Sequence, residues 1–485
     1  MYFGKWLRTG TLLVGLSFLL GGCASVSQNS TPATLDKLLS DPALQGATVS
    51  LMVRDASTGT TLYQHNPRTR LVPASNLKLL TTAAAMDVLG PHYRFATQLL
   101  SNGMRQGDRL TGNLYLRGLG DPSIQFADYQ ALAAQLASQG VRQVQGDLVF
   151  DDTWFDAERL GVDWSHDDET TYYGAQISAL TVAPNTDFDA GSVLVTAKAP
   201  LRVGSPVGVE IYPPTDYLQL NNRAVSGPGN SYGINRRHGT NLLQLSGAMA
   251  PGRQSQQLVS VWEPTQLVAN LFEQALAQQG IKVLGRRVMG GASPAGVTVL
   301  AEHQSAPLQE LIVPLLKLSN NAMSEALLKA MGRQTANSGT ASAGAVAVAG
   351  FLKRQGLDTS AVSQVDGSGL SRRNLVSSQT LTDLLLAASK QPWFDAWYNA
   401  LPVAGNADRM TGGSLGYRLR GTAAENNLHA KTGSMAGVSS LSGYLTDAHG
   451  RKLVFAMLTN NHVVAGAQVK TVENRVAVAL SRSGD

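Results

Sequence analysis

The predicted secondary structure changes character twice along this chain of 485 residues, and this limits the folds that the chain can adopt. The N-terminal part predicts two strands and then a helix over residues 75–89. From about Tyr93 short strands recur, and residues 189–257 are short apolar runs broken by Gly, Pro and Asn. After about Glu302 long helices return, followed by a hairpin over residues 438–460. We therefore expect an α+β fold whose middle section differs from its two ends.

The proportions of apolar and charged residues, 43% and 15%, are those of a globular protein that can bury a sizeable core. The length suggests several domains. The formal net charge is +5, but the basic residues form no run or stripe, so a nucleic-acid partner is not indicated. Further helices are predicted at residues 265–279, 308–317, 322–332, 342–355, 378–389 and 466–481.

The N-terminus has the pattern of a secretory signal peptide. Lys5 and Arg8 form a positive segment, and residues 11–20 form an apolar segment that is shorter than the roughly 20 residues of a membrane span. The tetrapeptide 20–23 (Leu-Gly-Gly-Cys) resembles a bacterial lipobox, in which the cysteine receives the lipid. We therefore predict a lipoprotein signal peptide over residues 1–23.

Cys23 is the only cysteine of the chain, so an intramolecular disulfide and a cysteine-ligated zinc site are both excluded. The small polar residues 24–34 predict a flexible tether between the lipid and the folded body. Ala24 stands where an aspartate would favour retention in the inner membrane. We therefore expect a periplasmic lipoprotein, anchored through Cys23 to the outer membrane.

The first chemical motif is S-x-x-K, formed by Ser75 and Lys78 at the start of a predicted helix. Residues three apart share a helix face. The helix dipole and burial both disfavour a charged lysine there, so Lys78 could accept the proton of the serine hydroxyl. Taken alone, the same pattern also fits a serine N-cap followed by a surface lysine.

Two further motifs follow. Ser319 and Asn321 form S-x-N between two predicted helices, where they could relay a proton and hold a substrate amide. The segment 431–433 is K-T-G, followed by Ser434, and it opens the C-terminal hairpin. Its lysine could hold a carboxylate, and its glycine would let a substrate backbone pass close to the strand. Each motif alone also fits ordinary caps and turns.

Together, the three motifs in this order are the set of the penicillin-binding proteins and class A β-lactamases. Six longer segments extend the resemblance to the class C low-molecular-mass penicillin-binding proteins, which are D-alanyl-D-alanine carboxypeptidases and endopeptidases. These segments are Pro73–Lys78, Gly118–Pro122, Tyr173–Leu180, Asp366–Arg372, Leu401–Gly405 and Ala430–Ser434. The resemblance covers nearly all the chain after the tether.

The resemblance implies a β-lactamase/transpeptidase-like catalytic domain, an antiparallel sheet flanked by helices, that is split by an inserted domain. The long separation of Ser75 from Ser319 fits such an insertion. The inserted α/β-type domain would itself carry a nested β-rich domain. The expected limits are 35–92 with 302–485 for the catalytic domain, 93–188 with 258–301 for the inserted domain, and 189–257 for the nested domain.

The resemblance also implies a mechanism without a cofactor or metal. Ser75 would be the nucleophile and Lys78 its general base, while Ser319 and Asn321 would pass the proton and orient the substrate. Lys431 and Thr432 would bind the terminal carboxylate of a peptidoglycan stem peptide, or of a β-lactam inhibitor. The backbone N–H groups of Ser75 and Ser434, beside Gly433, would form the oxyanion hole. Asp168 would meet the free amine of the stem peptide.

Other functions are less well supported by the sequence. Two G-x-S-x-G matches, centred on Ser231 and Ser414, lack the strand before and helix after that a nucleophile elbow needs. The eight histidines include no H-E-x-x-H motif or other pair at metal spacing, which argues against a metalloprotease. Two alternatives remain: a β-lactamase-like hydrolase, for which Glu263 would be a weak deacylating candidate, and a non-catalytic peptidoglycan-binding lipoprotein.

Overall fold

A computed structural model describes residues 31–484 of the chain. The predicted signal peptide, Cys23 and most of the predicted tether lie outside the described residues. The tether prediction, 24–34, is wrong at its end, because α1 (Thr31–Leu39) begins at Thr31. A proline at the second position suits a helix start, and Leu35 and Leu38 of this helix are buried. These two leucines fix the segment to the folded body.

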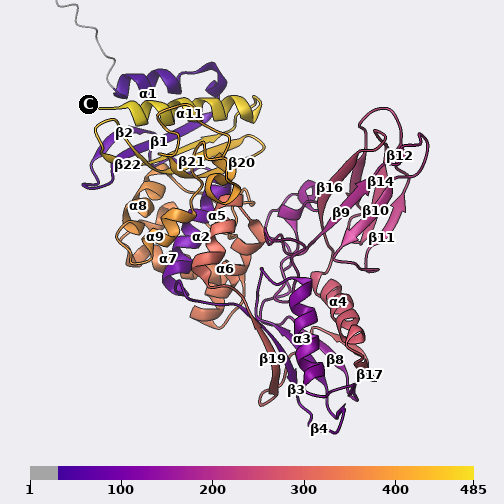
Figure 1. Cartoon of the computed structure of the whole chain (residues 1–485). Coiled ribbons are helices and arrows are strands. Elements are labelled where there is room, and N and C mark those ends of the chain that lie inside the picture. Colours follow the sequence, from indigo (N-terminus) through magenta and orange to yellow (C-terminus); the bar gives the residue numbers. More distant parts are fainter. Residues whose placement is uncertain (1–30, 485) are drawn as a thin grey trace, which may run out of the picture.

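The largest structural element that positions the candidate site is an antiparallel five-stranded sheet that joins the two ends of the chain (Figure 1). Its strand order is β2-β1-β22-β21-β20. The strands are β1 (Thr48–Asp55), β2 (Thr61–His65), β20 (His429–Met435), β21 (Val438–Thr446) and β22 (Lys452–Asn460). The bounds of β21 and β22 confirm the predicted hairpin.

Helices cover both faces of this sheet, with α1 and α11 on one side and the other helices of the layer below (Figure 1). The helices are α2 (Leu77–Val88), α5 (Leu308–Leu318), α6 (Asn321–Ala336), α7 (Ala341–Arg354), α8 (Ser378–Ala388), α9 (Phe394–Ala400), α10 (Arg409–Gly412) and α11 (Gly466–Arg482). The helices predicted after residue 302 are confirmed to within a few residues. The predicted helices did not include α9, a short helix whose Trp397 is fully buried.

Strand β22 explains why this sheet needs two helical layers. Side chains alternate between the two faces of a strand. Residues Leu453, Phe455 and Met457 belong to the apolar core that includes α1 and α11. Their neighbours Val454, Ala456 and Leu458 belong to the core that includes α2 and α8. An uninterrupted apolar run is therefore buried on both faces.

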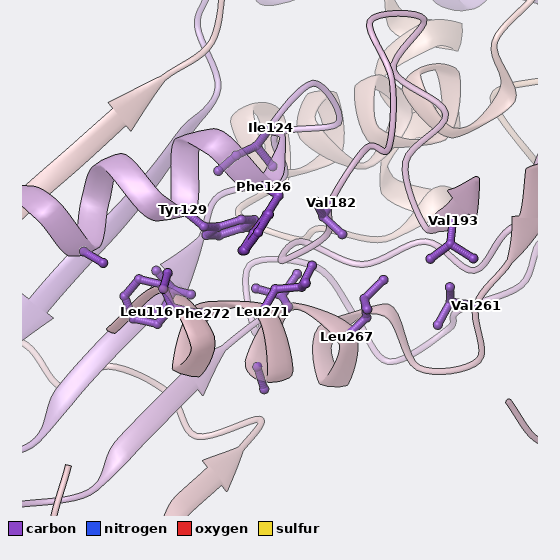
Figure 2. Close-up of a cluster of buried hydrophobic side chains, with 14 of the residues drawn as sticks. Leu116, Ile124, Phe126, Tyr129, Val182, Val193, Val261, Leu267, Leu271 and Phe272 are labelled. Carbon is purple, nitrogen blue, oxygen red and sulfur yellow. The ribbon is translucent and has the colours of Figure 1, made fainter. Parts of the chain in front are cut away.

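The middle of the chain forms a second α/β body. A mixed sheet has the order β18-β8-β6-β3-β19, and a smaller one has the order β17-β7-β5-β4. Helices α3 (Phe126–Ser138) and α4 (Pro264–Gln278) share a buried cluster beside them, in which Tyr129 meets Phe272 edge to face at 6.3 Å (Figure 2). The strands are β3 (Ala96–Ser101), β4 (Arg105–Gln106), β5 (Arg109–Leu110), β6 (Leu114–Gly118), β7 (Gln143–Val144), β8 (Leu148–Asp151), β17 (Lys282–Val283), β18 (Arg287–Met289) and β19 (Thr298–Gln304).

Between β8 and α4 lies a β-rich part made of three small sheets, β10-β9-β16, β11-β14-β13 and β12-β15. Its strands are β9 (Ser192–Lys198), β10 (Gly208–Tyr212), β11 (Gln219–Asn222), β12 (Val225–Ser226), β13 (Gly233–Arg236), β14 (Leu242–Ser246), β15 (Ala248–Met249) and β16 (Gln254–Ser260). The division into three domains with the limits given above stays a prediction. None of the helices within 31–484 is long and apolar enough to cross a membrane.

Candidate active site

The serine of S-x-x-K lies in a tight turn beneath the sheet. Residues Ala74–Asn76 form a 3-10 turn, and α2 begins directly after it at Leu77. Ala74 has a φ of 47°, a left-handed conformation that a residue with a Cβ rarely adopts. Gly369, on a neighbouring loop, packs so closely against this turn that a Cβ there would meet the carbonyl oxygen of Ala74 at 1.9 Å. The turn is thus held by its surroundings in a conformation that presents Ser75 to the solvent side.

Lys78 is completely buried under Ser75, contrary to a surface lysine after a helix cap. Its Nζ donates to Ser75 Oγ at 3.0 Å, to Asn321 Oδ1 at 2.7 Å and to the carbonyl oxygen of Ser368 at 2.7 Å. Burial lowers the pKa of Lys78 to about 7, although the negative charges of Glu325 and Asp366 act to raise it. A large share of this lysine is therefore neutral near pH 7 and able to accept a proton.

The S-x-N residues lie at the junction of α5 and α6. Ser319 ends α5 with a φ of 63°, and Asn320 caps α6 by accepting from the backbone N–H of Met323. Asn321 contacts Lys78, and Ser319 lines the same cleft as Ser75. The Nδ2 of Asn321 also donates to the carbonyl oxygen of Tyr173 at 2.8 Å.

K-T-G lies on β20, at the edge of the sheet. Lys431 is completely buried, and its Nζ donates to Ser319 Oγ at 2.9 Å and to the carbonyl oxygen of Thr432 at 2.8 Å. Burial, and secondly the charge of Lys78, hold the pKa of Lys431 well below its usual value. The hydroxyl of Thr432 is 2.7 Å from Ser414 Oγ. The three motifs thus meet at one place, as the resemblance implies.

The structure gives a further reason why residue 433 is a glycine, besides the predicted passage of a substrate backbone. A Cβ at this residue would meet Ser440 Oγ at 2.3 Å, the carbonyl oxygen of Pro73 at 2.7 Å and the backbone nitrogen of Ser75 at 3.0 Å. The close approach is therefore between β20 and the turn that carries Ser75, and not only between the strand and a substrate.

Replacing Gly433 by alanine is expected to lower the free energy of unfolding by about 1–3 kcal/mol, the usual cost of an extra buried methyl group without room. It should also slow acylation of Ser75, because the strand and the turn must move apart. Gly233→Ala is a matched control, since Gly233 also lies in a strand but has nothing within 4 Å of the position of an added Cβ. Chemical denaturation measures the free energy of unfolding, and acylation kinetics measure the rate at Ser75. If the two variants had the same stability and the same acylation rate, the close contact at Gly433 would be contradicted.

A cleft of about 760 Å³ opens over the three motifs. Its walls include Ser75, Ser319, Asn321, Ser434 and Asp168, among other residues. Asp168 comes from a short turn, residues 166–168, and accepts a hydrogen bond from the hydroxyl of Tyr173 at 3.0 Å. Asp168 therefore shares the cleft with the motif residues, on the wall that the middle of the chain contributes.

Two buried carboxylates beside the site carried no predicted role. Glu325 accepts the backbone N–H groups of Gly367 and Ser368, each at 2.8 Å, and Asp366 accepts those of Gly369 and Ser371. Burial, and then the charge of Asp366, raise the pKa of Glu325 above its usual value. The pair fixes the loop whose Ser368 carbonyl oxygen accepts a hydrogen bond from Lys78 Nζ. The available signal was Glu325 itself, an acidic residue one helical turn after Asn321.

The rival serine motifs lack the required geometry. Ser231 lies in a loop before β13, and its Oγ accepts from the backbone N–H of Ala248. Ser414 follows the four-residue helix α10 in a 3-10 turn. Neither serine stands between a strand and a helix. Glu263 directly precedes α4, and its carboxylate lies 3.8 Å from Arg159 in the middle body.

Comparison with known proteins identifies the family. Residues 31–483 match the model of the D-Ala-D-Ala carboxypeptidase 3 (S13) family. The chain belongs to this family. It is 43% identical over 477 residues to the D-alanyl-D-alanine carboxypeptidase of Actinomadura sp. (strain R39), a match that covers 97% of this chain and 88% of that protein.

Solved structures agree with this assignment. The structure of penicillin binding protein 4 from Haemophilus influenzae matches with a TM-score of 0.81 and 26% identity, over 92% of this chain and 99% of that one. The same protein in complex with a β-lactam matches with a TM-score of 0.76 over 93% and 99% of the two chains, at 24% identity. The predicted resemblance, the fold class and the carboxypeptidase function are thereby confirmed. The protein is a D-Ala-D-Ala carboxypeptidase.

Proposed function

We propose that this carboxypeptidase works through an acyl-enzyme on Ser75. The observation that carries the proposal is the 3.0 Å contact between Ser75 Oγ and the buried Nζ of Lys78. Neutral Lys78 takes the hydroxyl proton as Ser75 attacks the carbonyl carbon between the two D-alanine residues. Asn321 holds Lys78 in place by accepting its hydrogen bond. Ser319, which accepts a hydrogen bond from Lys431, passes the proton from Lys78 to the leaving amine. Water then hydrolyses the ester, and no cofactor takes part.

The same arrangement supplies sites for the two negative charges of the reaction. The backbone N–H groups of Ser75 and Ser434 stabilise the oxyanion of the tetrahedral intermediate, a role for which Gly433 brings strand and turn together. Lys431 and Thr432 bind the terminal carboxylate. A charge-assisted hydrogen bond of this kind contributes about 1.5–3 kcal/mol.

The direct test combines two substrates. Purified protein should release D-alanine from a peptide that ends in D-Ala-D-Ala, and a fluorescent penicillin should give a stable adduct. Penicillin carries the same carboxylate and a reactive amide, and the homologue from Haemophilus influenzae has been solved with a β-lactam. Rapid turnover of penicillin would instead indicate a β-lactamase, and the absence of both reactions would indicate a binding protein.

We also propose endopeptidase activity on peptidoglycan cross-links. A second cavity, of about 470 Å³, is bordered by Ser414, Lys317 and Arg409, and the hydroxyl of Ser414 contacts that of Thr432. Leu318 and Tyr172 border both this cavity and the cleft. A leaving group larger than D-alanine therefore has room past the carboxylate site. Mass spectrometry of products from cross-linked muropeptides distinguishes this cleavage from release of D-alanine.

Asp168 is proposed to bind the free amine of the stem peptide. Asp168→Asn is expected to raise the KM for an amine-bearing stem peptide about tenfold or more, because a charge-assisted hydrogen bond is lost. Acylation by a penicillin without that amine should change little. Asp167→Asn, one residue earlier on the same turn, is the matched control. Equal KM values for the two variants and the parent would exclude this role.

The proposed location is the bacterial periplasm, with a lipid on Cys23 that holds the protein at the outer membrane. Cys23→Ser is expected to move the protein from the membrane fraction to the soluble periplasmic fraction. One acyl chain holds a protein only weakly, so stable retention requires several chains on the cysteine. Fractionation and mass spectrometry of the N-terminal peptide test this directly. An unmodified Cys23 in the parent protein would refute the anchor.

A further inference from the structure

Two histidines that are far apart in the sequence meet one buried carboxylate beside the cleft. His166 belongs to the turn that carries Asp168, and His238 follows β13 in the β-rich part of the chain. Their rings lie 4.8 Å apart between centroids. The Oε2 atom of Glu169 lies 2.5 Å from His238 Nδ1 and 4.0 Å from His166 Nε2. One ligand atom from each of the three residues lies within 4.8 Å of the other two.

Glu169 is held so that this oxygen faces the histidines. Its other oxygen, Oε1, and its carbonyl oxygen both accept from the buried guanidinium of Arg236, and Ser260 Oγ also donates to the carbonyl oxygen. One carboxylate oxygen is therefore held by Arg236, and the other is directed to the two imidazoles.

The two histidines are exposed, whereas the carboxylate beneath them is not. The exposed fractions of the side chains are 71% for His166 and 64% for His238, against 8% for Glu169. The imidazoles can therefore turn without disturbing the core. Nitrogen and oxygen ligands lie about 2.0–2.2 Å from a tetrahedral zinc ion, so they lie roughly 3.3–3.5 Å from one another. This value falls between the two distances from Glu169 Oε2 to the histidine nitrogens, 2.5 Å and 4.0 Å. Small rotations of the rings bring all three ligands to that distance.

We propose that His166, Glu169 and His238 form a binding site for a divalent transition metal, with Zn²⁺ as the best fit. Two imidazoles and one carboxylate are a common zinc donor set, and the exposed side leaves a fourth place for water. The charged neighbours are Arg236, which already pairs with Oε1, and Asp167 and Asp168, which follow His166 on the same turn. A bound ion would join this turn to the β-rich part and hold the wall of the cleft that carries Asp168.

The test titrates the full chain with Zn²⁺ alone, in competition with a fluorescent zinc indicator. All samples carry Cys23→Ser, which removes the only thiol. The expected result is one Zn²⁺ per chain, with affinity reduced at least tenfold by His166→Ala and by His238→Ala. His92→Ala, which removes an exposed histidine elsewhere, should leave the affinity unchanged. Penicillin labelling of the zinc-free variants checks that each one is folded.

Two further measurements locate the ion. Co²⁺ in place of Zn²⁺ should give the visible absorption of a four-coordinate site in the parent and not in the two histidine variants. Hydrogen exchange of backbone amides in residues 165–170 should slow when Zn²⁺ is added. Absence of stoichiometric binding to the parent, or unchanged affinity in both histidine variants, would overturn the proposal.

Discussion

Replacing Ser75 by alanine is expected to abolish both penicillin labelling and release of D-alanine, with a loss of about four orders of magnitude or more, as for other nucleophiles. The fold should remain, because Ser75 is only half-buried and Lys78 keeps its contacts with Asn321 and Ser368. Stopped-flow acylation rates measure the loss of activity, and the melting temperature measures whether the fold is retained.

The matched control for this variant is Ser231→Ala. Ser231 is the centre of a G-x-S-x-G match and is exposed in a loop. Its replacement should leave labelling and hydrolysis at the level of the parent. A labelled Ser75→Ala protein, or loss of labelling in the control, would show that the nucleophile lies elsewhere.

Replacing Lys78 by arginine is expected to slow acylation by at least about two orders of magnitude, the lower range of general-base contributions. Arginine keeps a positive charge but cannot lose its proton at any working pH. The control is Lys329→Arg, at a buried lysine of α6 whose Nζ pairs with Asp156 and accepts no proton from Ser75. The acylation rates of the two variants are compared in single-turnover reactions with a penicillin, in samples that contain the same fraction of folded protein.

The pH dependence of acylation follows from the same lysine. The basic form of Lys78 is the neutral one, and the pKa of this lysine is lowered to about 7. The acylation rate of the parent should therefore rise tenfold per pH unit below pH 7 and level off above it. This rise of the rate with pH should be absent from the residual acylation by the Lys78→Arg variant. A parent rate that is flat from pH 5 to 8 would exclude Lys78 as the base.

The sequence predicted the elements whose signals are local. The apolar periodicity of α5–α8 and α11, and the turn between β21 and β22, depend on neighbouring residues, so these elements were predicted nearly to their ends. The short helix α9 was missed because seven residues are too few for a clear period. The start of α1 was missed because the polar residues 31–34 resemble a linker. Leu35 and Leu38 are buried in a core formed with the sheet and α11, which lie far away in the sequence.

The identities and order of Ser75, Lys78, Ser319, Asn321 and Lys431 were readable from the sequence alone, since short motifs carry their chemistry in residue type and spacing. Only the tertiary structure decided that both lysines are fully buried, which is what gives Lys78 a pKa near neutrality. Desolvation depends on the atoms that surround a charge, and these come from segments hundreds of residues apart. For the same reason, the meeting of His166 with His238 and the contact of Gly433 with the Ser75 turn had no sequence signal.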